Sequence, residues 1–182
     1  MLQKITLGTL GVVGVQRQRQ HVSWSTPAHE WFKLNSDGAR MLVDGRAKCG
    51  GTINDSNGNW IMDFAKGLGV CSVVVVELWG VYMCLLCVWN LNIHNVEIEV
   101  DSLEALRLIR LGAHSQSVPG IVLHIVKLCD RDWSVSFQHI HHEGNKVIDQ
   151  ITQFADAETL EVRWFHELLL KVGRLLHGDV GD

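Results

Sequence analysis

The feature that most constrains the fold is an apolar stretch of twenty residues, 70–89, that contains a single carboxylate, Glu77. A run of this length could cross a membrane as a helix. A carboxylate near the centre of a bilayer costs about 2.5–3.5 kcal/mol, however. Only the twelve residues 78–89 follow Glu77 without a charge, which is typical of a buried core helix. We therefore predict a core helix over residues 72–90, and a membrane span is the alternative.

On this helix, Glu77 falls in the apolar stripe that should face the rest of the protein. Spacings of four, seven, eight and eleven residues place it with Val81, Cys84, Leu85 and Val88. A buried carboxylate without a partner is strongly unfavourable, so Glu77 needs a cation, a metal ion or a place at the rim of the core. The alternative is a first-turn carboxylate that interacts favourably with the helix dipole.

Periodicity and turn residues predict further elements on both sides of this helix. The predicted strands are residues 31–37, 49–54, 59–66, 96–100 and 133–139, and the further helices are residues 102–111, 119–128, 145–155 and 158–176. An Asp-Ser-Asn-Gly loop at residues 55–58 indicates a hairpin between the second and third strands. The long helix before the fourth strand implies a parallel crossover, so the sheet is expected to be mixed.

Length and composition narrow the class of protein. The 182 residues suffice for one domain with tails. We place a poorly structured lead-in at residues 1–30, the domain at residues 31–156 and a helical tail at residues 157–182. The net charge of −4 argues against nucleic-acid binding through bulk positive charge alone, but it allows a nucleic-acid enzyme that uses metal ions. Five cysteines, an odd number, favour a reducing, intracellular location, nuclear or cytoplasmic, over secretion.

Four carboxylates occupy positions that invite a functional interpretation. They are Asp37 at the end of the first strand, Glu77, Asp101 at the close of the fourth strand, and Asp149 in a predicted helix. Separately, Asp37 could form an Asp-Gly turn, Asp101 could be an N-cap, and Asp149 could complement a helix dipole. Together they could converge at one edge of the sheet, where cations would have to neutralise them. Oxygen ligands suit Mg²⁺ or Mn²⁺, and two such ions about 3.5–4 Å apart can promote phosphodiester cleavage.

Three histidines, His139, His141 and His142, precede Asp149 by ten, eight and seven residues. A histidine beside a metal cluster could carry protons or aid product release. Together with Glu143 they could also suggest zinc, but their spacing matches no structural zinc pattern. Packed or solvated side chains are the ordinary alternative for at least two of them.

Five segments resemble, in order, the plant ribonuclease H-like domain of non-long-terminal-repeat retrotransposon reverse transcriptases and of genes derived from them. The segments are WFKLNSDGA, CGGTINDSNGNW, VVVELWGVYMCL, VEIEVDSLEAL and DWSVSFQHIHHEGNKVIDQ, and the similarity covers about residues 24–155. The resemblance implies a ribonuclease H-like α/β fold. This fold has a five-stranded mixed sheet, three antiparallel strands followed by two parallel strands, flanked by helices.

The same resemblance implies a metal-dependent endonuclease that hydrolyses the RNA strand of RNA–DNA hybrids. Asp37 would bridge two Mg²⁺ ions, or Mn²⁺ in their place, and Asp149 would complete the site that holds the attacking water. Glu77 and Asp101 would hold the second ion, and His139 corresponds to the loop histidine of these enzymes.

The implied partner is the hybrid, recognised by its 2′-hydroxyls and shape, and a monomer without membrane attachment is expected. The alternative function is a catalytically degenerate nucleic-acid-binding protein of the same fold. It is suggested by departures from the family pattern around Asp149, namely His-Glu-Gly-Asn at residues 142–145 and Ile-Asp-Gln-Ile-Thr at residues 148–152.

Overall fold

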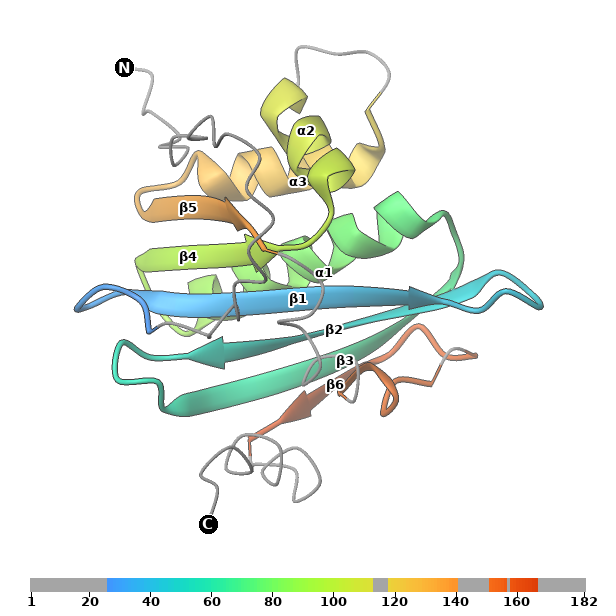
Figure 1. Cartoon of the computed structure of the whole chain (residues 1–182), viewed down its shortest axis with the longest axis horizontal. Coiled ribbons are helices and arrows are strands. Elements are labelled where there is room, and N and C mark those ends of the chain that lie inside the picture. Colours follow the sequence, from blue (N-terminus) through green and yellow to red (C-terminus); the bar gives the residue numbers. More distant parts are fainter. Residues whose placement is uncertain (1–25, 113–117, 141–150, 157, 167–182) are drawn as a thin grey trace, which may run out of the picture.

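A six-stranded mixed sheet forms the centre of the protein in a computed structural model that describes residues 26–112, 118–140, 151–156 and 158–166 (Figure 1). The elements are β1 (Phe32–Arg40), β2 (Arg46–Asn54), β3 (Trp60–Val70), α1 (Val73–Asn90), β4 (Asn95–Val100), α2 (Leu103–Leu111), α3 (Gly120–Cys129), β5 (Ser134–His139) and β6 (Val162–Phe165). The strand order is β5-β4-β1-β2-β3-β6. Strands β1, β2, β3 and β6 are antiparallel neighbours, and β4 and β5 join parallel to β1, as predicted for the first five strands.

The hairpin between β2 and β3 follows from local side-chain chemistry. The Asp55 carboxylate accepts hydrogen bonds from the amides of Asn57 and Asn59, each at 2.8 Å. Gly58 has a φ of 81°, a left-handed conformation that glycine adopts without steric cost. These contacts confirm the hairpin that the Asp-Ser-Asn-Gly loop predicts.

A sixth strand, β6, lies in a segment near the C-terminal end that the sequence predicts to be helical. β6 pairs antiparallel with β3 inside the segment predicted as a helix, residues 158–176. That prediction is wrong at Val162–Phe165, where Trp164 packs against Phe64 with ring centroids 5.9 Å apart. The edge of β3 has unpaired backbone N–H and C=O groups, and a pairing strand forms hydrogen bonds with them. This pairing determines the local structure, although the apolar residues have helical spacing. Residues 167–176 lie outside the described residues.

Helix α1 supplies much of the hydrophobic core. It lies against one face of the sheet, together with α2 and α3 (Figure 1). The predicted stripe is buried, since Val81, Cys84, Leu85 and Val88 all have no exposed surface. By length and composition α1 could cross a membrane, but 56% of its residues are buried inside the protein. The packing favours the core-helix interpretation.

The two faces of the sheet differ sharply in character. An added Cβ at Gly51 would contact Cys84 of α1, whereas one at Gly50 would contact Thr152, so alternate residues face opposite sides. The face toward α1 is apolar, with Leu34, Ile53, Phe64, Val96 and Ile98 fully buried. The opposite face carries Lys33, Asn35, Asp37, Thr52, Asn54, Asp63, Glu97 and Glu99. Ala65 lies on the same face and packs with Ile151 and Ala155.

Candidate active site

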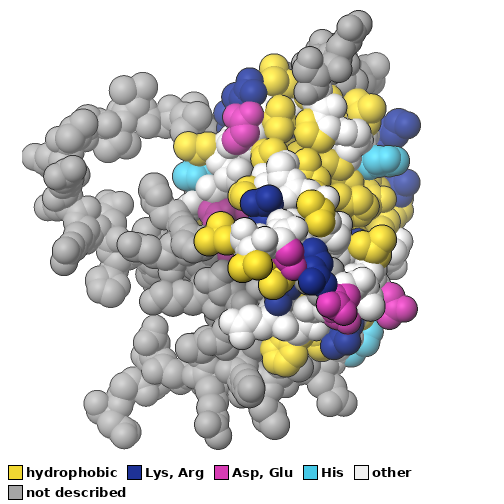
Figure 2. Space-filling model, turned by 90° about the vertical axis from the view of Figure 1, so that its right-hand side faces the viewer, with side chains coloured by type: hydrophobic (Ala, Val, Ile, Leu, Met, Phe, Trp, Pro, Cys, Tyr) yellow, Lys and Arg dark blue, Asp and Glu magenta, His cyan; other side chains and the backbone are white. Residues whose placement is uncertain are grey.

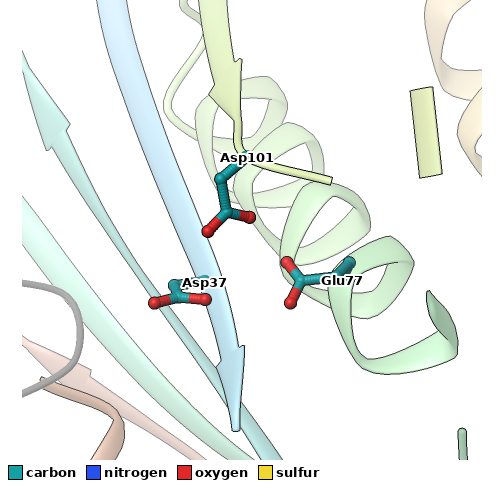
Figure 3. A group of neighbouring side chains, drawn as sticks. All are labelled: Asp37, Glu77 and Asp101. Carbon is teal, nitrogen blue, oxygen red and sulfur yellow. The ribbon is translucent and has the colours of Figure 1, made fainter. Parts of the chain in front are cut away.

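Three of the four predicted carboxylates meet at one end of the sheet. Asp37 lies in β1, Glu77 in α1, and Asp101 directly after β4. One oxygen from each carboxylate lies within 4.8 Å of the other two, and Figure 3 shows the three side chains converging. Strands β1 and β4 are parallel neighbours, and the carboxyl ends of parallel strands are where sites form in α/β sheets.

The position of Asp37 differs from the prediction. Strand β1 continues to Arg40, so Asp37 lies within the strand and the Asp-Gly pair does not form a turn. The glycine serves a different purpose. A Cβ at Gly38 would lie 2.2 Å from Cγ1 of Val76 and 3.2 Å from Oε1 of Glu77. Because Gly38 has no Cβ, α1 can approach β1, and Glu77 lies close to Asp37.

A second glycine on α1 serves the same approach. A Cβ at Gly80 would lie 3.1 Å from the Cβ of Ser36, tighter than ordinary van der Waals contact. Both glycines lie in segments that carry the family resemblance, but the sequence alone predicts no role for them in the site. In the sequence, such a close contact is indicated only by a small residue on each of the two elements that pack together.

Asp101 does not cap α2. The N-cap is Ser102, whose Oγ accepts a hydrogen bond from the Ala105 amide at 3.1 Å, so the capping role predicted as the alternative for Asp101 is wrong. The half-buried Asp101 carboxylate instead points toward the cluster (Figure 3). His139 ends the neighbouring strand β5, and its Nε2 lies 3.1 Å from the Asp101 carbonyl oxygen. The structure therefore brings His139 to the edge of the same site.

Glu77 has the least favourable environment of the three. It is only 5% exposed and is the fifth residue of α1, so the first-turn alternative is excluded. No described residue donates a hydrogen bond to its Oε2. Burial, and then the charges of Asp101 and Asp37, raise the pKa of Glu77 to about 9, although the Gly38 amide opposes this rise. The carboxyl group therefore holds a proton at neutral pH unless a cation is bound nearby.

The cluster fits a hard divalent cation. All its donors are carboxylate oxygens, which suit Mg²⁺ or Mn²⁺ rather than softer metals. The orphaned Oε2 of Glu77 is a buried acceptor without a partner among the described residues, and a bound cation would satisfy it. A cation would also remove the repulsion that raises the Glu77 pKa.

Asp149, the fourth predicted carboxylate, lies outside the described residues, so its membership of the site stays a prediction. The same holds for His141, His142 and Glu143. Most of the helix predicted over residues 145–155 is also outside them. Thr152, near its end, packs beside the site, because an added Cβ at Gly50, the cross-strand partner of Asp37, would lie 3.0 Å from its Cγ2.

Solved structures with the same architecture are ribonucleases H. Ribonuclease H1 of Halobacterium salinarum has a TM-score of 0.57 at 14% identity, covering 66% of this chain and 93% of that one. LC11-RNase H1, isolated from compost and crystallised with an RNA/DNA hybrid, has a TM-score of 0.59 at 21% identity, covering 71% and 99%. The predicted ribonuclease H-like fold is thus confirmed, with six strands instead of five.

Sequence comparison identifies the family. Residues 35–155 match the family model described as reverse transcriptase-like. An Arabidopsis thaliana protein, provisionally named as a ribonuclease H protein, is 32% identical over 174 residues, which are 92% of this chain and 28% of that protein. The chain belongs to the reverse transcriptase-like family and is a ribonuclease H-like domain of retroelement origin. It spans little more than a quarter of the length of this relative.

Proposed function

We propose that this domain hydrolyses the RNA strand of RNA–DNA hybrids with divalent metal ions held by Asp37, Glu77 and Asp101, and by Asp149 as a fourth ligand. The observation that carries the proposal is the convergence of three carboxylates from separate elements within 4.8 Å of one another. Such a cluster destabilises a fold unless cations bind it. The hybrid as substrate is supported by the ribonuclease H1 crystallised with one.

The carboxylates divide the task of holding the ions. Asp37 would be the ligand common to both ions, Glu77 and Asp101 would help to hold one of them, and Asp149 would help to hold the other. When bound, such ions activate water and stabilise the leaving oxygen of a phosphodiester. The Gly38 amide donates a 2.7 Å hydrogen bond to Oδ1 of Asp37 and thereby restrains this carboxylate.

We assign to His139 a role in proton transfer beside the cluster. A carbonyl oxygen can only accept a hydrogen bond, so the contact with Asp101 O assigns the hydrogen to Nε2 of His139. In the neutral imidazole, Nδ1 is then the basic nitrogen. We assign to this nitrogen the uptake of a proton near the metal site during turnover.

Surface charge is consistent with a need for metal ions. Figure 2 shows the end of the molecule on the right of Figure 1, where the described lysine and arginine side chains are interspersed with acidic and apolar ones. The net charge of the whole chain is −4. Bound divalent ions would supply positive charge where the phosphates of the hybrid approach.

The test is cleavage of a labelled RNA–DNA hybrid by the full chain as Mg²⁺ is titrated. We expect metal-dependent cleavage, and we expect Asp37→Asn and Asp101→Asn each to reduce it by at least about 100-fold, because each removes a ligand charge. Asp132→Asn is the matched control. It makes the same change at an exposed residue before β5, and activity should be unchanged.

Two outcomes would contradict the proposal. Cleavage that survives Asp37→Asn or Asp101→Asn would exclude a mechanism that depends on this cluster. Hybrid binding by the unaltered chain without any cleavage, at every Mg²⁺ or Mn²⁺ concentration tested, would instead support the degenerate nucleic-acid-binding protein.

A further inference from the structure

The pairing between β1 and β4 ends just before the candidate active site. Asn35 and Glu99 are the last residues that these two parallel strands pair in register. Asp37 follows two residues later in β1, and Asp101 follows two residues later, directly after β4. The two carboxylates therefore lie roughly 6–7 Å beyond the last pair, where the ladder between β1 and β4 no longer fixes their separation.

Side chains join the two strands at this last pair. Nδ2 of Asn35 donates a hydrogen bond to Oε2 of Glu99. Nζ of Lys33 donates a second one, of 2.7 Å, to Oε1 of the same carboxylate. All three residues are buried, with exposed fractions of 4% for Asn35, 7% for Glu99 and 1% for Lys33. The Glu99 carboxylate of β4 is thus held by two donors of β1, and we call this arrangement the cross-strand tie.

Both hydrogen bonds of the cross-strand tie involve a charged group. Burial lowers the pKa of Lys33, but the hydrogen bonds and charges of Glu99 and then of Glu97 raise it overall, so the ammonium group stays charged. An ionised carboxylate can only accept, which assigns Nδ2 and not Oδ1 of Asn35 to the contact with Glu99. Hydrogen bonds to charged groups are stronger than neutral ones, so the tie restrains the two strands firmly.

Stability alone does not account for the cross-strand tie. Oδ1 of Asn35 is buried and has no donor among the described residues, and this is unfavourable. A buried ion pair such as Lys33 with Glu99 adds little net stability, because both charges must leave water. Apolar side chains of similar size would fill the same space without these costs. The geometry that the tie imposes on β1 and β4 is the better explanation.

That geometry matters because the next carboxylates along the two strands repel each other. Asp37 and Asp101 belong to the cluster whose oxygens lie within 4.8 Å of one another (Figure 3). Without a cation, this repulsion acts to separate the ends of β1 and β4. A cation that binds separated ends must first bring them together, which lowers its apparent affinity. The cross-strand tie opposes the separation from two residues away.

We propose that Asn35, Glu99 and Lys33 are positioning residues, which hold Asp37 and Asp101 at the separation that a divalent cation requires. They act through the two strands and are not ligands themselves. The inference rests on the metal site of the proposed function and adds three residues outside the carboxylate cluster. Metal binding without substrate tests it, so it does not depend on cleavage of the hybrid.

Calorimetric titration of the metal-free full chain with Mn²⁺ tests the cross-strand tie. We expect Asn35→Leu, which changes no charge, to raise the Kd at least tenfold, the smallest loss usual for residues that support metal ligands. The matched control is Asn54→Leu, at a buried asparagine of β2 whose Nδ2 lies 3.5 Å from the Gly58 carbonyl oxygen. Its Kd should change less than twofold. Urea unfolding of both variants separates a loss of affinity from a loss of stability. A rise of less than threefold for Asn35→Leu, or an equal rise in both variants, would overturn the proposal.

Two substitutions at Glu99 test the tie from β4, in case Asn35→Leu does not fold. Both remove the charge, but only glutamine keeps an oxygen that can accept the hydrogen bond from Asn35. We therefore expect Glu99→Leu to raise the Kd for Mn²⁺ at least tenfold and Glu99→Gln to raise it less than threefold. Equal weakening by the two substitutions would show that only the charge of Glu99 matters, which contradicts a positioning role.

The unaltered chain separates this inference from the proposed function. If the unaltered chain binds no Mn²⁺, both are contradicted. If it binds Mn²⁺ and cleaves the hybrid, while Asn35→Leu and Glu99→Leu bind Mn²⁺ as tightly, the proposed function stands and the positioning role is refuted.

Discussion

Glu77 combines deep burial with two neighbouring carboxylates, and this combination determines how the protein responds to pH. Its pKa rises from the ordinary value of 4.5 to about 9, mainly because of burial and then because of Asp101 and Asp37. Between these two values the folded protein holds a proton that the unfolded chain releases. The free energy of unfolding of the metal-free protein should therefore fall as pH rises through this range.

We predict that Glu77→Gln removes most of this pH dependence, because the amide does not titrate. The fall in the unmodified protein should be on the order of a few kcal/mol. The measurement is urea unfolding at several pH values between about 5 and 9 in the presence of a chelator. Glu161→Gln, at an exposed carboxylate, is the control and should retain the full fall. An equal slope for Glu77→Gln and the unmodified protein would show that Glu77 is ionised in the metal-free fold.

At the scale of secondary-structure elements, the site depends on how closely α1 packs against β1. Gly38 has no side chain at the point where Val76 and Glu77 approach the strand. A methyl group there would push the helix away and separate Glu77 from Asp37. The geometry of the carboxylate cluster is thus a consequence of element packing as well as of the acids themselves.

We predict that Gly38→Ala lowers the free energy of unfolding by about 1–3 kcal/mol, because the new Cβ overpacks a tight contact. Its cost should be smaller in a Val76→Ala background, where the nearest clashing atom, 2.2 Å away, is gone. Gly120→Ala is the control, since a Cβ there meets nothing within 4 Å. Thermal and urea unfolding of the four variants measures both effects. Additive costs of the two substitutions would indicate that α1 does not pack on Gly38 as described.

The elements also show which features local sequence can predict. The loop at residues 55–58 is specified by its own side chains, and the stripe of α1 by its spacing, so both predictions are confirmed. Asp101 and Ser102 are both good N-caps, and only the three-dimensional arrangement shows that Ser102 takes this role. β6 forms because the edge of β3 is available, which no local pattern in residues 158–176 reveals.

At the scale of the whole molecule, the predicted meeting of Asp37, Glu77 and Asp101 is observed, although Asp37 lies within β1 instead of at its end. The order of strands and helices is sufficient to bring these residues together, because β1 and β4 are parallel and α1 crosses between β3 and β4. The close approach at Gly38 could not be predicted, because it depends on atoms from two elements. The burial of a polar sheet face was also not anticipated, since alternation in single strands does not show what covers them.

The central claim is that this carboxylate cluster binds divalent cations. Crystals of the full chain grown with Mn²⁺ and an uncleavable hybrid would test it directly through the anomalous scattering of manganese. We predict peaks about 2.2 Å from carboxylate oxygens of Asp37, Glu77 and Asp101, at the usual length of a bond between such a cation and oxygen. Well-ordered crystals with the hybrid bound and no anomalous peak among these three residues would contradict the account.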